Sequence, residues 1–327
     1  MIELPWGRFY NSDAIEGARS FLEDGSVDLV ITDPPYGIGG ESLHHHYNRD
    51  EELVVDGYVE VPPERYGDFS RAWVREAERA LRPGGSMYVV SGYTNLYHIL
   101  AALGETSLQE VNHIIWKYNF GVYTTRKFVS SHYHILYYAK PGAERTYNLE
   151  ARYGLDERDP SGRSLNYRDR EDVWVINREY KPGKVKNKNE LPRELLVKMM
   201  QYSSHEGDRV CDFFLGGFST AEVAAGLGRH FVGFELSEEA FRHGVRRVRD
   251  VEVGHLLPDL REPVCDRRSR NRGKPWTPEE ERHLLRRYRE MRGSGAGKLA
   301  SVEALRDEFG RGRFALENVL RRLDEWK

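Results

Sequence analysis

The sequence predicts an α/β fold, namely a doubly wound, largely parallel sheet, followed by a small all-α module. Three observations lead to this prediction. Strand patterns alternate with helical patterns over most of the first 250 residues, which is typical of parallel sheets. Two of the strand patterns run into loops rich in proline or glycine. Beyond about residue 272 the chain carries only helical patterns.

The composition is that of a globular protein, because 39% of the 327 residues are hydrophobic and 31% are charged. No stretch approaches the roughly 18–20 apolar residues of a membrane span. The N-terminus lacks the basic start and apolar run of a signal peptide. With Cys211 and Cys265 alone, a disulfide framework and a Cys-based zinc site are both excluded. We therefore expect no membrane partner and a cytoplasmic location.

The first half of the chain alternates the two patterns in order. We predict strands over residues 7–13, 27–32, 86–91, 111–117 and 132–140, and helices over 14–22, 69–81 and 96–103. The strand over 27–32 is a continuous apolar run that Pro34 stops. The stretch over 37–65 is long and polar, and loops of that length are usually functional or disordered.

Periodicity fades over residues 141–189 and then returns. A helix begins at Pro192. It is followed by a strand over 209–214, a glycine loop, a helix over 220–227, a strand over 230–236 and a charged helix from Ser237. These elements complete the α/β domain, which we place over residues 1–260.

The C-terminal part reads as a separate module over residues 275–327. Thr277 is predicted to cap its first helix, with Pro278 at the first helical position and Glu280 completing a capping box. A second helix begins near Ser301, and after a glycine break a third covers 313–326, as in a helix-turn-helix module.

The charge of the chain is uneven. The net charge is −3, yet residues 261–327 hold 18 Lys and Arg against 12 Asp and Glu, a net +6. A basic linker over 261–274 includes an arm, Arg267 to Lys274, with five positive residues and no acid. This asymmetry indicates a polyanionic partner, and a merely solvated linker is the alternative.

The sharpest chemical motif is Asp33-Pro34-Pro35-Tyr36, directly after a strand. Consecutive prolines hold a stiff, extended turn. That turn presents a carboxylate, outward carbonyls and an aromatic face, which suit a planar ring with an exocyclic amine. Asp33 and the Pro34 carbonyl can accept both amine hydrogens, and Tyr36 can stack on the ring. A proline turn with a surface aspartate is the alternative.

The second motif runs from Arg209 to Thr220. Gly216 and Gly217 let a ligand approach the backbone, and the helix that begins near Thr220 offers free N–H groups. Glu235 follows Asp212 by 23 residues, where an acid can bind ribose hydroxyls. A structural glycine turn is the alternative. Asp33 and Asp212 should end neighbouring central strands, so that both loops face one crevice.

Together the two motifs resemble those of the amino-directed DNA methyltransferases that use S-adenosylmethionine, over roughly residues 8–250. The order, with the catalytic motif first and the cofactor loop last, is that of their β arrangement, a Rossmann-like sheet with permuted motifs. The resemblance implies catalytic roles for Asp33, Pro34, Pro35 and Tyr36. It places Asp13 at the adenine of the cofactor, and it implies further cofactor contacts by Asp212, Phe214, Gly216, Gly217, Ser219, Thr220 and Glu235.

The sequence departs from the family pattern at three positions. Phe213 replaces the usual proline, Phe218 stands where a second glycine is common, and Leu191 precedes Pro192 where lysine is common. Asp212, Gly216 and Thr220 remain, so we do not interpret the departures as inactivation. Phe218 is expected to make the cofactor loop bulkier.

The resemblance implies an adenine-N6 methyltransferase that acts on an adenine flipped out of double-stranded DNA. Other acceptors remain open: cytosine N4, an RNA base or a protein glutamine amide. Glutamine enzymes, however, usually carry Asn-Pro-Pro-Tyr and place the cofactor loop first. A third hypothesis is a catalytically silent DNA-binding regulator. The resemblance also implies a DNA-associated protein that is bacterial, archaeal or phage-encoded. A homodimer and a cognate restriction endonuclease are also open as partners.

Contacts with DNA are predicted in three places. The region over 141–189 would belong to target recognition, while Phe120, Tyr123, Arg126 and Lys127 lie between two strands and Arg313 and Arg321 lie on the last helix. For the residues between the two strands, an ordinary solvated hairpin is the alternative. For the last helix, the alternative is a dimerisation or packing role of the C-terminal module. We predict no metal site, because His44, His45 and His46 are adjacent and do not naturally share one ion.

Overall fold

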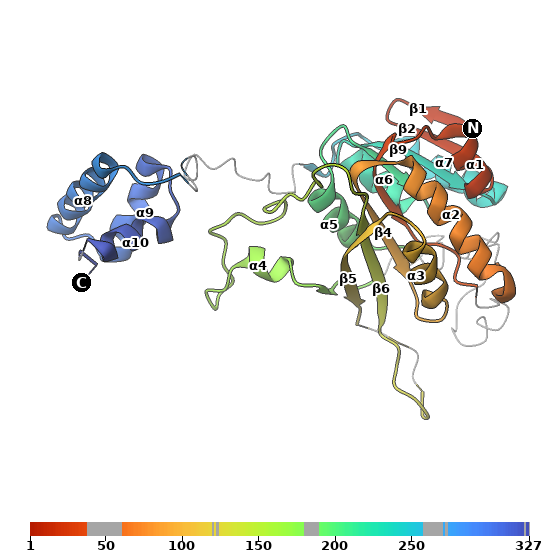
Figure 1. Cartoon of the computed structure of the whole chain (residues 1–327), viewed down its shortest axis with the longest axis horizontal. Coiled ribbons are helices and arrows are strands. Elements are labelled where there is room, and N and C mark those ends of the chain that lie inside the picture. The colour runs from red at the N-terminus through yellow and green to blue at the C-terminus, as the bar shows by residue number, and fades with distance from the viewer. Residues whose placement is uncertain are drawn as a thin grey trace. The chain divides into compact units, whose positions relative to one another are not determined.

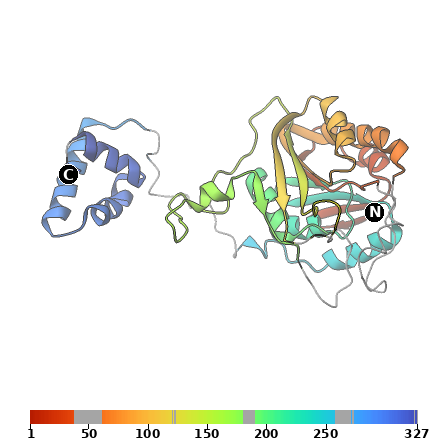
Figure 2. The ribbon, with the colours of Figure 1, turned by 90° about the horizontal axis from the view of Figure 1, so that it is seen from below.

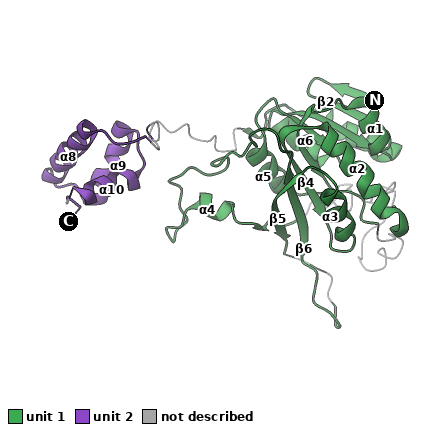
Figure 3. Ribbon diagram, viewed as in Figure 1, with its two compact units in different colours: residues 1–262 green, residues 263–327 purple. Residues whose placement is uncertain are grey.

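The computed structural model describes residues 1–37, 61–119, 121, 124–179, 190–257, 271, 274–323 and 325–326. The chain forms two compact units, Met1–Glu262 and Pro263–Lys327 (Figure 3). Each unit is described by itself. In the described parts of the chain, no helix is long and apolar enough to cross a membrane.

The first unit is built on one sheet, whose described strands follow the order β1-β2-β9-β8-β3-β4-β6-β5-β7. In this order, each neighbouring pair from β2 to β4 is parallel, and so is the pair of β5 and β7. The other neighbouring pairs are antiparallel. The strands are β1 (Ile2–Leu4), β2 (Gly7–Asn11), β3 (Val27–Thr32), β4 (Leu81–Ser91), β5 (Gln109–Lys117), β6 (His132–Ala139), β7 (Val173–Val175), β8 (Arg209–Asp212) and β9 (His230–Glu235). The predicted α/β fold, with a largely parallel central sheet, is confirmed.

Helices cover both faces of the sheet (Figure 1, Figure 2). One hydrophobic core lies under α1 (Ala14–Phe21), α2 (Tyr66–Ala80) and α3 (Leu96–Gly104), and the other lies under α5 (Arg193–Ser203), α6 (Ser219–Gly226) and α7 (Glu238–Val248). Adjacent residues of a buried strand supply opposite cores, because successive side chains point to opposite faces. Leu29 packs in the second core and Val30 in the first.

Several elements differ from the sequence prediction. β4 begins at Leu81 rather than residue 86, because its pairing with β3 continues through a register shift, with Gly84 at a φ of 76°. The short elements β1, β7, η4 (Pro63–Arg65) and α4 (Leu165–Asp169) were not predicted. They are three to five residues long, too short for a hydrophobic period to be visible. β7 nevertheless attaches part of the region 141–189 to the sheet, in parallel with β5.

The second unit contains α8 (Pro278–Gly293), α9 (Lys298–Phe309) and α10 (Arg313–Arg322). The predicted capping box is present, because Thr277 accepts a hydrogen bond from the Glu280 amide and Glu280 accepts one from the Thr277 amide. Gly310 ends α9 in the left-handed conformation. α10 ends at Arg322 rather than Trp326. The three helices share a core that includes Leu284, Tyr288, Val302, Leu305, Phe309, Leu316 and Leu320.

Candidate active site

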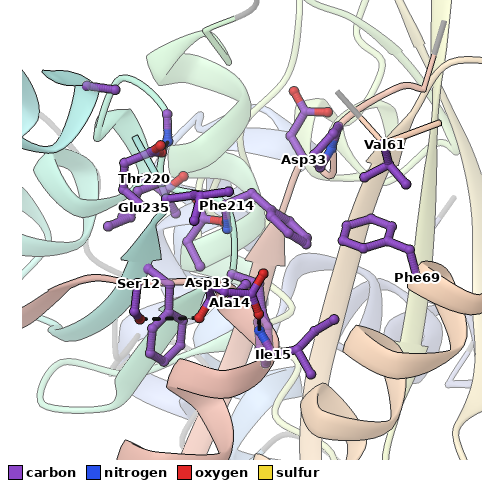
Figure 4. Close-up of a pocket in the computed structure, with 18 of the residues that line it drawn as sticks. Ser12, Asp13, Ala14, Ile15, Asp33, Val61, Phe69, Phe214, Thr220 and Glu235 are labelled. Carbon is purple, nitrogen blue, oxygen red and sulfur yellow. Dashed lines mark hydrogen bonds between the residues drawn. The ribbon is translucent and has the colours of Figure 1, made fainter. Parts of the chain in front are cut away.

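A cavity of about 560 Å³ opens at the carboxyl ends of the neighbouring strands β3 and β8 (Figure 4). Asp33 follows β3 directly, and Asp212 is the last residue of β8. Both line the cavity. The two motifs, 179 residues apart in the sequence, therefore meet at one crevice, as the parallel pairing predicted.

Asp33 sits in a fixed turn. The Tyr66 hydroxyl donates a 2.7 Å hydrogen bond to the Pro35 carbonyl, and the Asn95 amide donates to the Tyr36 carbonyl. Asp33 Oδ2 accepts a 3.1 Å hydrogen bond from the Tyr36 hydroxyl. The other oxygen, Oδ1, is buried and has no hydrogen-bond partner among the described residues. A rigid turn thus holds one acceptor oxygen ready for a donor that the chain itself does not provide.

The surroundings of Asp33 favour its protonated form. Burial raises the pKa of Asp33 to about 8, and the nearby Asp212 carboxylate adds to the rise. The Tyr36 hydroxyl and the Arg178 guanidinium act in the opposite direction and lower this pKa. Arg178 was not singled out in the sequence, where nothing in the irregular region 141–189 marks it.

The structure brings Tyr36 to Asp33 and also stacks its ring on Tyr133 of β6, with centroids 5.8 Å apart and planes 25° apart. One face of Tyr36 is therefore already covered by protein. Pro34 is buried, while Pro35 lines the cavity.

Asp212 anchors the glycine loop from the strand end. Its Oδ1 accepts hydrogen bonds from the Phe214 amide and the Thr32 hydroxyl, both 3.0 Å long. Burial raises the pKa of Asp212 to about 6, against these hydrogen bonds and one from Thr220. Thr220 and Ser219 begin α6 and line the cavity.

Glu235, at the end of β9, holds the same loop from the other side. Its carboxylate accepts hydrogen bonds from the amides of Gly216, at 2.9 Å, and Ser237, at 2.8 Å. Burial raises the pKa of Glu235, and these backbone hydrogen bonds partly offset the rise. Gly216 and Gly217 also line the cavity. The acid is thus fixed at the mouth of the loop, where it can accept from a diol.

Phe218 does not narrow the cavity, contrary to the expectation of a bulkier loop. Its side chain is fully buried in the core, stacked on Phe9 at 5.5 Å. It is the only non-glycine residue with a positive φ, 62°, in the described part of the chain. The backbone therefore keeps the left-handed conformation that glycine adopts easily, while the ring points into the core. Phe213 is likewise buried, beside Trp73.

Most of the apolar side of the cavity comes from residues that no sequence motif marked. The Phe69 and Phe214 rings lie 5.7 Å apart, and Ile15 and Val61 lie beside them in the cavity lining (Figure 4). Asp13 caps α1, because its Oδ1 accepts from the Ile15 and Glu16 amides. Of this group only Asp13 and Phe214 were predicted. Arg65, Asp68, Glu190 and Leu191 also line the cavity and were not predicted to contact a cofactor.

None of the described residues that were predicted to contact DNA lines the cavity. Arg126 and Lys127 are exposed between β5 and β6, while Phe120 and Tyr123 fall outside the described residues, as do His44, His45 and His46. In the second unit, Arg313 donates to Glu317 at 2.6 Å and Arg321 lies over Trp326. Within the described ranges, no group of three His, Cys, Asp or Glu could hold a metal ion.

Known proteins share both the sequence pattern and the fold. The family model N6_N4_Mtase, described as DNA methylase, matches residues 27–246. The chain is 28% identical over 235 residues to the type II methyltransferase M.HpaI of Haemophilus parainfluenzae, covering 71% of each chain. It is 26% identical over 260 residues to M.HinfI of Haemophilus influenzae, covering 73% of this chain and 67% of that one.

A solved structure supports the fold comparison. The putative DNA modification methylase TTHA0409 of Thermus thermophilus, complexed with S-adenosylmethionine, superposes with a TM-score of 0.54 at 25% identity. The superposition covers 75% of this chain and 94% of that one.

Proposed function

The chain belongs to the N6_N4_Mtase family of DNA methylases, and from this premise we propose that it methylates the N6 amine of adenine in a specific DNA sequence. It is a site-specific DNA methyltransferase that uses S-adenosylmethionine. The observation that carries the proposal is Asp33 Oδ1, a buried acceptor oxygen without a partner among the described residues, at the edge of the cavity.

The residues around the cavity fit this cofactor. The paired rings of Phe69 and Phe214 suit an adenine ring, and Glu235 can accept from the ribose hydroxyls. Asp13, Gly216 and Gly217 complete that side of the cavity. When bound there, S-adenosylmethionine supplies an electrophilic methyl group.

The remaining chemistry belongs to the turn that follows β3. A base inside a duplex cannot reach the cavity, so the target base must leave the stack. Asp33 and the Pro34 carbonyl then accept the two amine hydrogens and direct the nitrogen lone pair toward the methyl group as the nitrogen becomes tetrahedral. Neither a metal ion nor a covalent bond to the base is required by this route, and Cys211 takes no part in it.

The choice of adenine rests on Asp33 as the first residue of the motif, since the cytosine-N4 branch of the family often has serine there. Cytosine N4 is the second candidate, because the family includes both activities. The test is to incubate the purified chain with unmethylated bacterial DNA and labelled cofactor, and then to identify the modified nucleoside by mass spectrometry. N6-methyladenine supports the proposal, and N4-methylcytosine overturns the adenine assignment.

We further propose a division of labour along the chain. Residues 1–260 form the catalytic domain, 141–189 contribute to target recognition, 261–274 are a basic linker and 275–327 are a helix-turn-helix-like module that holds double-stranded DNA. Sequencing the DNA modified in a host with and without the gene would reveal the recognition sequence. A chain that binds DNA but neither binds nor consumes the cofactor would instead be a silent regulator.

A further inference from the structure

Arg178 lies in a cage of aromatic rings beside the catalytic turn. Its guanidinium carbon is 5.0 Å from the ring centroid of Tyr118, 5.2 Å from that of Tyr133 and 5.8 Å from that of Trp116. Guanidinium groups are attracted to the faces of aromatic rings within about 6 Å. The cage therefore fixes both the place and the charge of this side chain.

The residues on either side of Arg178 are also anchored. Two residues earlier, the Ile176 carbonyl accepts a buried 2.8 Å hydrogen bond from the Trp116 indole, and the Ile176 amide donates to the Lys117 carbonyl. One residue later, the Glu179 carboxylate accepts a 2.7 Å hydrogen bond from the first amide of α5, that of Arg193. Arg178 is thus held between the edge strand β7 and α5.

A chain of contacts links Arg178 to Asp33. Arg178 and Tyr36 both act on the Tyr133 hydroxyl and lower its pKa against the effect of burial. The Tyr133 ring stacks on that of Tyr36, whose hydroxyl donates to Asp33 Oδ2. Arg178 and Asp33 also attract each other directly as opposite charges.

We propose that Arg178 is a positioning residue for Asp33: its positive charge favours the ionised form of the Asp33 carboxylate against burial and the Asp212 charge, and its contacts with Tyr133 hold Tyr36 against that carboxylate. The proposal rests on the proposed function in one respect, namely that Asp33 must accept a hydrogen from the target amine. Only the ionised form accepts through both oxygens, whereas a protonated carboxyl turns one of them into a donor.

The charges around Asp33 show why such a residue is needed. Asp212 of β8 faces Asp33 as a second carboxylate, and burial together with this repulsion raises the pKa of Asp33. Tyr36 on its own segment and Arg178 beyond β7 lower that pKa. Tyr133 of β6 is neutral at ordinary pH, because burial raises the pKa of its hydroxyl. Among these groups, Arg178 is the one that brings positive charge.

The position of Arg178 in the chain connects the catalytic turn with the region assigned to target recognition. It follows β7, within the region that we assign to target recognition. Ordering of that region and ionisation of the catalytic carboxylate therefore depend on the same segment.

A double-mutant cycle followed by thermal unfolding tests the interaction between Arg178 and Asp33, and it requires no methylation assay. Thermal unfolding of wild type, Arg178→Gln, Asp33→Asn and the double variant is measured at pH 5 and pH 9. At pH 9, where Asp33 is ionised, Arg178→Gln should lower Tm by about 2–4 °C more in the wild-type background than in the Asp33→Asn background. At pH 5 Arg178→Gln should lower Tm by the same amount in the wild-type and Asp33→Asn backgrounds. Equal losses in both backgrounds at pH 9 would overturn the proposal.

The pH dependence of methylation gives the second readout. Arg178→Gln should move the acid limb of the kcat/KM profile to higher pH by about one unit. The variant should therefore have about a tenfold lower kcat/KM than wild type at pH 7, and the difference should disappear at high pH. Arg178→Lys should restore most of the limb because it keeps the charge. A loss that is the same at every pH would mean that Arg178 has only a structural role.

Two controls keep the outcomes separate. Arg242→Gln changes an exposed arginine on α7, paired with Glu238, and should alter neither readout. If Arg178→Gln does not fold, Tyr133→Phe removes the shared hydroxyl while keeping the ring, and should shift the acid limb in the same direction. If the wild-type protein methylates nothing, the proposed function fails, whereas the double-mutant cycle still decides whether Arg178 acts on Asp33.

Discussion

The hydroxyl of Thr32 donates a 3.0 Å hydrogen bond to Asp212 Oδ1, and so joins the ends of the two central strands. Both residues are buried, and they are 180 positions apart in the sequence. Because Thr32 immediately precedes Asp33, this bond ties the Asp33–Tyr36 turn to the start of the glycine loop that follows Asp212. The acceptor side and the donor side of the proposed reaction are therefore held in register by the sheet itself, through rigid elements rather than through loops.

Replacement of Asp33 by alanine should abolish methyl transfer while cofactor binding largely survives. Asp33 is assigned to the acceptor amine, and a contact made in the transition state affects turnover more than cofactor affinity. Methylation rates and calorimetric titration with S-adenosylmethionine measure the two effects separately. Near-normal turnover of the variant would remove Asp33 from the catalytic assignment.

Ionisation of the buried Asp33 carboxyl should lower the stability of the protein at high pH. The folded-state pKa of Asp33 is raised to about 8 from its ordinary value of 3.8, so stability is lost progressively as pH rises between these values. Asp33→Asn cannot ionise, and should therefore raise Tm relative to wild type at pH 9 but have little effect near pH 4. Unfolding curves across this range test the sign. A variant less stable than wild type at pH 9 would show that burial of the charge is not costly.

Much of the fold was predictable because the long buried strands carry strong signals. The strand over Val27–Thr32 has the predicted bounds, since a continuous apolar run followed by prolines has a sharp end. The two motifs could be placed at one crevice because the carboxyl ends of adjacent parallel strands share an edge. The capping box at Thr277 was equally visible, since its geometry depends on only four residues.

The rest of the site depends on contacts that have no local pattern. Phe69 lies on a helix that was predicted for its apolar periodicity, and nothing in that period distinguishes a core residue from one that lines a cavity. Arg178 follows a three-residue strand and meets its aromatic partners only through tertiary packing. The expectation for Phe218 was wrong, because backbone conformation and side-chain direction cannot be read from the residue type.

The Glu235 carboxylate should contribute strongly to cofactor affinity. Glu235→Ala should weaken S-adenosylmethionine binding by about 1.5–3 kcal/mol, roughly 10- to 150-fold, through loss of charge-assisted hydrogen bonds. Glu235→Gln is the matched control, because it keeps an acceptor for the Gly216 amide but loses the charge. Calorimetric titration distinguishes these variants. An affinity unchanged in both would exclude Glu235 from the site.

Phe218 and Gly244 should behave as a coupled pair. A Cβ atom added at Gly244 would lie 2.0 Å from the Phe218 ring, so Gly244→Ala should destabilise the protein by about 1–3 kcal/mol. In a Phe218→Gly background that clash is absent, and the added methyl group should be nearly neutral. Urea unfolding of the four proteins gives the coupling energy. Additive effects would mean that the Phe218 ring does not pack against α7 as described.

Deletion of residues 268–327 should weaken DNA binding but leave cofactor binding intact. The cavity is lined entirely by residues of the first unit, so its geometry does not require the second. The deleted residues carry 16 Lys and Arg against 10 Asp and Glu, including four of the five positive residues of the basic arm. Each phosphate that the arm neutralises releases counterions, so affinity should fall less steeply with salt once the arm is gone.

The competing interpretation of the second unit is that it holds two protomers together. Some of its helical arginines are already engaged within the unit, because Arg313 and Arg322 pair with Glu317 and Glu281. We therefore expect the basic arm, rather than α10, to make the phosphate contacts that cause the salt dependence. A variant with Arg267, Arg268, Arg270 and Arg272 changed to glutamine should therefore reproduce most of the reduced salt slope while keeping the helices. Binding isotherms at several salt concentrations, with sedimentation of the same samples, decide the matter: an unchanged slope with a dimer turning into a monomer would refute DNA binding by the arm and establish dimerisation.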